Sequence, residues 1–279
     1  FFFISWFIIC IDTINTNNKS TNEEKSAAID RVNVAKIDAI NSITNATTTQ
    51  LVNDAKNSGN TSITQILPST AVKTNALAAL ATEAKNKNAI IDQTPNATAE
   101  EKEEANNKVD GLQEEADANI LKAQTTEEVN NIKNQAVQNI NAVQVEVIKK
   151  QNVKNQLNQF IDNQKKIIEN TPDATLEEKA EANRLLQNVL TSASDEIANV
   201  DHNNEVDQAL DKARPKIEAI VPQVSKKRDA LNAIQEAFNS QTQEIQENQE
   251  ATNEEKTEAL NKINQLLNQA KVNIDQAQS

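Results

Sequence analysis

Thr98-Ala99-Glu100-Glu101-Lys102 is the pentapeptide on which the fold of this chain depends. The same pattern, Thr-x-Glu-Glu-Lys, begins at Thr21, Thr175 and Thr252, so the residue number rises by 77 from each copy to the next. We call this spacing the repeat period, because a fixed period of this size is the signature of a tandem repeat. We therefore divide the 279 residues into a lead, three full repeats and the start of a fourth repeat: 1–20, 21–97, 98–174, 175–251 and 252–279.

Each pentapeptide has the chemistry of a helix start. A Thr followed three residues later by Glu forms a capping box, in which each side chain accepts a hydrogen bond from the backbone of the other residue. The two acidic residues also suit the positive end of the helix dipole. Loss of one such Thr is expected to cost about 1 kcal/mol. Paired carboxylates also serve acid–base catalysis, but capping alone explains four copies at helix starts.

The composition predicts an all-α protein and excludes several function classes. The chain has 2 Gly, no Tyr or Met, and 3% aromatic residues, so turn residues are too sparse for a β-rich fold. The net charge of −13, without a visible basic stripe, argues against nucleic acid and against adsorption to anionic membranes. A single cysteine, Cys10, excludes an internal disulfide and a multi-cysteine metal site.

The first eleven residues, FFFISWFIICI, differ from the rest of the chain. An apolar run of this length is too short to span a bilayer, which needs roughly 20 residues. It has no basic segment before it and no small-residue cleavage site, as a signal peptide has. We expect a fragment boundary or a stretch translated out of context. From about Ile11 the repeat register holds, because Ile14 lies one period before Ile91, so the lead includes the end of a preceding repeat.

Three apolar stripes at helical spacing follow one another in the repeat 98–174. The first stripe follows the Thr98 cap: Ala105, Val109, Leu112, Ala116, Ile120 and Ala123. The second follows a further cap at Thr125: Val129, Ile132, Ala136, Ile140, Val143 and Val147. The third contains Leu157, Ile161 and Ile168, and the residues of the other repeats match all three. Each repeat is therefore predicted to form three helices of roughly 20–25 residues.

Three antiparallel helices with facing stripes predict a three-helix bundle, left-handed and similar to spectrin repeats. The predicted fold class is an all-α, elongated tandem array of such bundles, each supported by its neighbours. We expect a bend or break in the second helix at Gly59-Asn60-Thr61 and at Arg214-Pro215. The alternative is a long helical hairpin, because 147–157 is compatible with one continuous helix joining the second and third stripes.

These caps, and the junctions TPNAT at 94–98 and TPDAT at 171–175, resemble a known family. They are similar to the helical repeats, called a domain of unknown function, of staphylococcal cell-wall-anchored surface proteins of the methicillin-resistance surface protein type. The resemblance covers 11–279. It implies an extracellular array on a Gram-positive cell, anchored to the wall in the full-length protein and associated with adhesion, aggregation, biofilm or antibiotic resistance. The signal peptide and the anchor are expected outside this stretch.

No residue is predicted to be catalytic, to bind a cofactor or to hold a metal. His202 is interpreted as a turn residue, because no cluster of ligands accompanies it. Phe160 and Phe238 are interpreted as core residues. The pairs Lys149-Lys150 and Lys226-Lys227 recur one period apart and are interpreted as a solvated helix face.

Two functions remain open, with an enzyme a distant third. The first is a non-catalytic stalk or spacer, supported by near-uniform repetition. The second is a helical module that binds a host serum or matrix protein, a role that needs an exposed apolar patch. The partners implied by the resemblance are host matrix or serum proteins, or the same protein on neighbouring cells. No nucleic acid, no cofactor and no insertion of the repeats into a membrane are expected.

Overall fold

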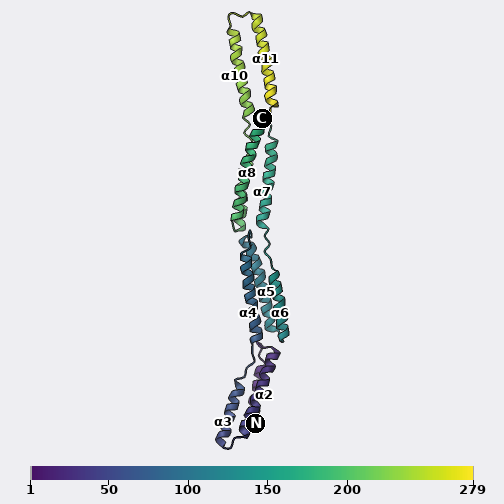
Figure 1. Cartoon of the computed structure of the whole chain (residues 1–279), viewed down its shortest axis with the longest axis vertical. Coiled ribbons are helices and arrows are strands. Elements are labelled where there is room, and N and C mark those ends of the chain that lie inside the picture. Colours follow the sequence, from purple (N-terminus) through teal and green to yellow (C-terminus); the bar gives the residue numbers. More distant parts are fainter. Residues whose placement is uncertain (1, 279) are drawn as a thin grey trace. The chain divides into compact units, whose positions relative to one another are not determined.

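The computed structural model describes residues 2–278, with the backbone alone for residues 2–6. Phe1, at the start of the predicted apolar lead, and Ser279 lie outside the described residues. Every regular element in the described part is an α-helix, which confirms the predicted fold class (Figure 1). The chain divides into two compact units, which are described separately: 1–95 with 100–146, and 96–99 with 147–279.

Helices begin directly after the four recurrent threonines, as predicted. Thr21, Thr175 and Thr252 each close a capping box at the start of α2 (Asn22–Thr44), α8 (Leu176–Asn199) and α11 (Asn253–Gln276). Thr98 directly precedes α5 (Ala99–Lys122). The local sequence therefore fixes where these helices start.

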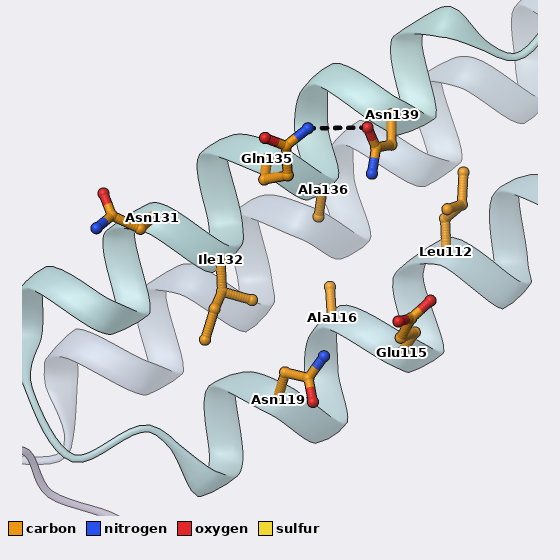
Figure 2. Close-up of a pocket in the computed structure, with 9 residues that line it drawn as sticks. All are labelled: Leu112, Glu115, Ala116, Asn119, Asn131, Ile132, Gln135, Ala136 and Asn139. Atoms are coloured by element: carbon orange, nitrogen blue, oxygen red, sulfur yellow. Dashed lines mark hydrogen bonds between the residues drawn. The ribbon is translucent and has the colours of Figure 1, made fainter.

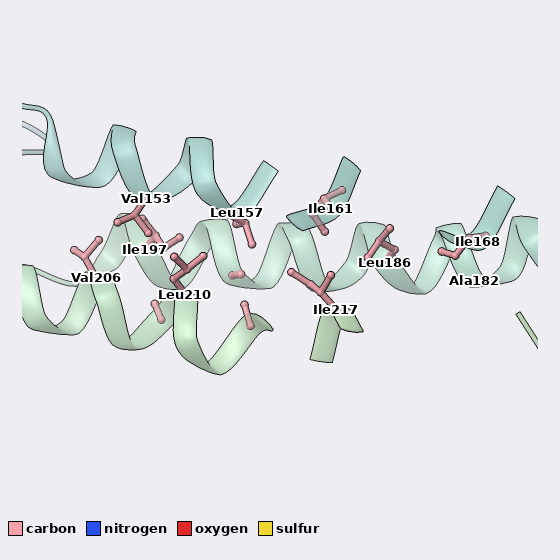
Figure 3. Packing of buried hydrophobic residues seen from close by; sticks show 13 residues of the cluster. Val153, Leu157, Ile161, Ile168, Ala182, Leu186, Ile197, Val206, Leu210 and Ile217 are labelled. Carbon is pink, nitrogen blue, oxygen red and sulfur yellow. The ribbon is translucent and has the colours of Figure 1, made fainter. Parts of the chain in front are cut away.

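The complete bundle of the second unit consists of α7 (Lys149–Glu169), α8 and α9 (Asn203–Glu218). Figure 3 shows their buried side chains meeting between the three helices. Leu157 from α7, Leu186 from α8 and Val206 from α9 are each fully buried. Phe160 is half-buried against the same cluster, with the Arg214 guanidinium 4.6 Å from the centre of its ring. The predicted stripes thus close one core.

Two bundles make up the first unit. Buried residues of α4 (Ala71–Asp92), α5 and α6 (Thr126–Ala142) form one cluster. Those of α1 (Phe2–Asn15), α2 and α3 (Thr49–Thr64) form another. Phe7 and Cys10 pack against this second cluster, at positions one period before Ala84 and Lys87. The apolar lead therefore continues into the first helix of a bundle.

The last two helices, α10 (Lys226–Glu247) and α11, pack side by side in the second unit without a third helix among the described residues. Neither contains a buried residue. Phe238 is only half-buried here, so its interpretation as a core residue applies to a core that is open on one side.

The third helices of the bundles end within one residue of the same register position, and their course corrects two expectations. Gly59 and Pro215 lie inside α3 and α9, and both helices continue past them, so a break does not occur there, while the bend expected as the alternative stays a prediction. The alternative hairpin is also wrong, because α6 ends at Ala142 and α7 begins only at Lys149. After each end, an apolar residue of the following linker packs against the bundle: Ile66, Val143 and Ile220. Since α6 contains neither Gly nor Pro and ends at the corresponding place, Gly59 and Pro215 are not what ends these helices, which have only 16 or 17 residues.

Each core groups one helix that precedes a Thr cap with two helices that follow it. In the second unit, α7 precedes Thr175 and shares its core with α8 and α9. The repeats defined by the Thr caps have the same period as the bundles. Each of these repeats, however, starts at the second helix of a bundle, whereas the bundle itself starts one helix earlier. Whether the segments that begin at the caps fold alone stays a prediction.

Candidate functional site: the joint between consecutive bundles

A backbone hydrogen bond recurs with the period of the sequence. The amide of the residue after each Thr donates to a carbonyl about one hundred residues further on. The donor–acceptor pairs are Asn22 to Gln124 at 2.8 Å, Ala99 to Asp201 at 2.7 Å and Leu176 to Gln278 at 2.7 Å. The first bond lies in the first unit and the other two in the second. Each bond satisfies an amide that the first turn of a helix otherwise leaves without a partner.

One carboxylate caps two helices at this joint. Glu24 accepts the Thr21 amide of its own capping box at 2.9 Å, and its second oxygen accepts the Val72 amide at the start of α4 at 3.0 Å. Glu178, two periods later, accepts the Thr175 amide at 3.0 Å. Its second oxygen accepts the amides of Ser225 and Lys226 at 2.9 and 3.1 Å, at the start of α10. The second Glu of the pentapeptide therefore connects one bundle to the next.

The first Glu of the pentapeptide adds to the joint in the first unit. Glu23 accepts hydrogen bonds from both the amide and the hydroxyl of Thr126, each at 3.0 Å, at the start of α6. The hydroxyls of Thr21 and Thr126 lie 3.2 Å apart. Residues that are distant in the sequence thus meet where α2, α4 and α6 begin.

These hydrogen bonds hold the joint carboxylates in their ionised form. Amide bonds from Glu23 itself and from Thr126 lower the pKa of Glu23 from 4.5 to about 2. Amide bonds from Ser225 and Thr175 lower the pKa of Glu178 from 4.5 to about 2. For Glu24, burial raises the pKa, but the amides of Thr21 and Val72 and further hydrogen bonds outweigh it and the net pKa is lowered.

A lysine closes the other side of the joint. Lys73 is buried, and its ammonium donates to the carbonyls of Asn18 and Leu121 at 3.0 and 2.8 Å. Burial lowers the pKa of Lys73, and the nearby charge of Lys25 lowers it further. Leu121 lies in the last turn of α5, whose carbonyls carry the negative end of the helix dipole.

The equivalent lysines act in the same way, which corrects the interpretation of the lysine pairs as a solvated face. Lys150 is buried and donates to the Ala198 carbonyl at the end of α8 at 2.9 Å. Lys227 donates to the Asp275 carbonyl at the end of α11 at 2.7 Å. Lys73, Lys150 and Lys227 are one period apart, as are their acceptors. The matched spacing of the lysines and their acceptors was the signal in the sequence for a structural role. The recurrence of the lysine pairs by itself does not indicate this role.

In two of the bundles, an open groove runs between the second and third helices. Figure 2 shows the groove of about 410 Å³ between α5 and α6, with Ala116 and Ala136 at its base and Asn119, Gln135 and Asn139 along it. A groove of about 180 Å³ between α8 and α9 is lined by residues one period later, including Ala193 and Ala213. Small residues at both bases leave this space, and four of the nine residues that line the groove between α5 and α6 carry amide side chains.

The described residues do not bring ionisable side chains together as a metal site would. Among them, no group of three His, Cys, Asp or Glu side chains is placed to hold an ion. His202 lies at the start of α9, where its amide donates to Glu205 at 3.2 Å, in the place that Thr125 takes before α6. In residues 2–278, no helix combines the length and apolarity needed to cross a bilayer. The absence of catalytic, cofactor and metal residues stays a prediction.

Comparison with protein families assigns the repeat. The model of the family described as Domain of Unknown Function (DUF1542) matches residues 10–71, 72–148, 149–225 and 226–279. The chain belongs to this family. The resemblance inferred from the caps and junctions is thereby confirmed. The four matches begin near the first helix of each bundle, so they follow the cores rather than the Thr caps.

The chain is also similar to curated surface proteins of Staphylococcus aureus. It is 26% identical over 269 residues to the "Extracellular matrix-binding protein EbhA" of strain Newman, covering 96% of this chain and 8% of the relative. It is 26% identical to the "Extracellular matrix-binding protein ebh" of strain COL and 27% identical to EbhA of strain N315. The chain spans only 3% and 4% of the lengths of these two proteins. No solved structure matches the chain.

Proposed function

We propose that this chain is a non-catalytic stalk segment of an extracellular bacterial surface protein, in which bundles joined in one repeated manner act as a spacer. The observation that carries the proposal is the recurrence of the same joint. The bonds from Asn22, Ala99 and Leu176 repeat with the sequence period. Bonds from Lys73, Lys150 and Lys227, which connect the first helix to the end of the second helix within a bundle or pair, repeat with them. A joint with fixed partners transmits orientation from one bundle to the next, as a spacer requires.

The similarity to matrix-binding surface proteins supports the location that this function needs. We place the segment outside the cell, in a protein anchored to the cell wall, where it supports adhesion, aggregation or biofilm formation. Antibiotic resistance enters the proposal only through the resemblance to proteins of the methicillin-resistance type. A carboxylate with a pKa of about 2 keeps its charge, and therefore its joint bonds, across the pH range of such surfaces.

Small-angle X-ray scattering of the whole chain tests the spacer. Helices of 22 residues are about 33 Å long, so a spacer in which three bundles and the pair α10–α11 follow one another would extend to more than about 100 Å. A single globule of this length has a radius of gyration of about 19 Å. We expect the radius of gyration of the unaltered chain to lie well above that value. A Glu24→Gln, Glu178→Gln double variant should change the radius of gyration, because it loosens two joints. If the unaltered chain had the radius of gyration of a globule, the spacer function would be contradicted.

The names of the relatives favour a second function, the binding of extracellular matrix. The groove between α5 and α6 and its counterpart between α8 and α9 are the recurrent concave surfaces that such a module would offer. Surface plasmon resonance of the whole chain against immobilised fibronectin, fibrinogen and albumin tests it. Saturable binding that an Ala116→Arg, Ala193→Arg variant abolishes would favour binding over spacing. Absence of saturable binding to all three leaves the spacer as the function.

A further inference from the structure

The linker from α3 to α4 and the linker from α9 to α10 differ at one position of the joint. In the α3–α4 joint, the Arg31 guanidinium of α2 donates to the Leu67 carbonyl of the linker at 2.7 Å. Two periods later, the same two positions hold Leu185 on α8 and Val221 in the linker. Because a leucine side chain has no donor group, Leu185 cannot make this bond in the α9–α10 joint.

A cavity lies where the bond cannot form. It has a volume of about 690 Å³ and lies between the start of α8 and the linker, with Leu185 and Val221 both in its wall. The guanidinium of the neighbouring Arg184 is bound to the two carboxylate oxygens of Glu181 instead, at 2.6 and 2.8 Å. The α9–α10 joint therefore has open space beside the linker and no basic group directed into it from this turn of α8.

This cavity does not depend on how many helices follow the linker. In the α3–α4 joint, the following bundle has all three of its helices, α4, α5 and α6. Arg31 and Leu67 are exposed all the same, with Leu67 at 61%. Val221 is exposed to a similar extent, at 54%. A third helix beside α10 and α11 would therefore leave the positions of Leu185 and Val221 uncovered.

The bundle between these two joints has a basic residue at the same position. Lys108 of α5 lies one period after Arg31, and its ammonium pairs with the Glu104 carboxylate at 2.8 Å. The hydrogen bond and the charge of Glu104 raise the pKa of Lys108, and the charge of Glu146 in the following linker raises it further. A basic side chain thus lies near the linker in two bundles, and Leu185 is the exception.

The two ends of the linker are held alike in both joints. At the start of the linker, Ile66 and Ile220 pack against the cores of their bundles. At its end, Glu24 and Glu178 accept amides at the start of the next helix, from Val72 and from Lys226. The difference between the joints is therefore confined to the middle of the linker.

We infer that the residue at this position sets how far a joint bends. Arg31 fixes the middle of the linker to the second helix of its bundle and stiffens the α3–α4 joint. Leu185 leaves the middle of the linker unfixed, so the α9–α10 joint is the more flexible one. The inference concerns single joints and does not depend on the stalk function.

Double electron–electron resonance between two nitroxide labels measures bending at each joint of the full chain. The labels replace exposed residues, Asn33 and Thr82 across the α3–α4 joint and Gln187 and Glu236 across the α9–α10 joint. The two pairs lie in the same register two periods apart, and Cys10→Ala removes the native thiol in every sample. The width of the distance distribution reports how far the joint bends.

Exchanging the residue at this position should exchange the behaviour of the joints. Arg31→Leu should widen the distribution between 33 and 82, because a hydrogen bond from a charged donor changes the ratio of bonded to open joints about fivefold. Leu185→Arg should narrow the distribution between 187 and 236, because it supplies the missing donor beside the Val221 carbonyl. An unchanged width in either variant would overturn the inference.

Two matched variants separate the bond from the substitution itself. Arg184→Leu removes a guanidinium one residue away and should leave the width between 187 and 236 unchanged. Leu185→Met keeps an apolar side chain without a donor and should also leave it unchanged. A narrowing by Leu185→Met equal to that by Leu185→Arg would overturn the inference, since it would show that filling the cavity is enough. So would a change of the width by Arg184→Leu as large as that by Leu185→Arg.

Discussion

The bundle α7–α9 and the pair α10–α11 have the same sequence pattern one period apart and differ in burial. Both second helices, α8 and α11, start with a complete capping box. Ile197 of α8 is fully buried, whereas its counterpart Ile274 of α11 is only half-buried. The comparison teaches that these helices are specified locally, by caps and apolar period, while a core exists only where a third helix closes it.

The largest contrast is expected for the matched isoleucines. Ile197→Ala should cost about 2–5 kcal/mol, because it leaves a cavity in a closed core. Ile274→Ala should cost less than about 1.5 kcal/mol, since the site is open to water. Hydrogen-exchange mass spectrometry reports the two helix groups separately in one molecule. Equal losses of protection would mean that α10–α11 is closed in solution.

The next contrast concerns the lysines that cap helix ends. Lys150→Met should cost about 1–3 kcal/mol, because it leaves the partly buried carbonyl of Ala198 without its charged donor. Lys227→Met should cost less, as water reaches the carbonyl of Asp275 on the exposed α11. Exchange rates of amides in the last turns of α8 and α11 measure both effects. A larger loss for Lys227 would contradict the role of burial.

The Thr caps should not show this contrast. Thr175→Ala and Thr252→Ala each remove an acceptor for an amide in the first helical turn, and each should cost about 1 kcal/mol. The two losses are expected to be similar because the bond is local and does not depend on a third helix. Exchange in the first turns of α8 and α11 measures them. A cost near zero at Thr252 would show that the cap needs a closed bundle.

The smallest effect is expected from acid. Folding lowers the pKa of Glu178 from 4.5 to about 2, so its contribution to stability is complete above about pH 4.5 and is lost as the pH falls towards 2. A Glu178→Gln variant should flatten the pH dependence of exchange at the starts of α8 and α10 over this interval. The matched variant is Glu255→Gln, since the pKa of Glu255 is lowered by Thr252 alone. A similar flattening in both would argue against the bridge between helices.

The sequence predicted what is repeated and local. Caps at Thr21, Thr98, Thr175 and Thr252 and the apolar stripes identified the helix starts and the core residues. It did not predict that α3 and α9 continue through Gly59 and Pro215, because the cost of a single weak residue is outweighed by packing on both sides. Nor did it predict the end of α6, which follows from the docking of Val143 onto the bundle.

The candidate joint was only partly predictable. The capping role of Glu24 and Glu178 follows from the sequence, because both partners lie within one turn. Their second bonds, to Val72 and to Ser225, join residues about fifty positions apart, which no local pattern indicates. The interpretation of Lys150 as part of a solvated helix face was wrong for the same reason, because no local pattern indicates its distant acceptor.

By itself, the sequence determined the repeat period, an all-helical chain and the place where each capped helix starts. These are properties of neighbouring residues and of regular spacing, so hydrogen bonds within one turn and the apolar pattern along one helix are enough to fix them. Only the tertiary structure decided which helices share a core, where the third helix of each bundle ends, and that a single carboxylate caps two bundles. These depend on residues brought together from distant parts of the chain, where packing of the whole bundle outweighs local preference.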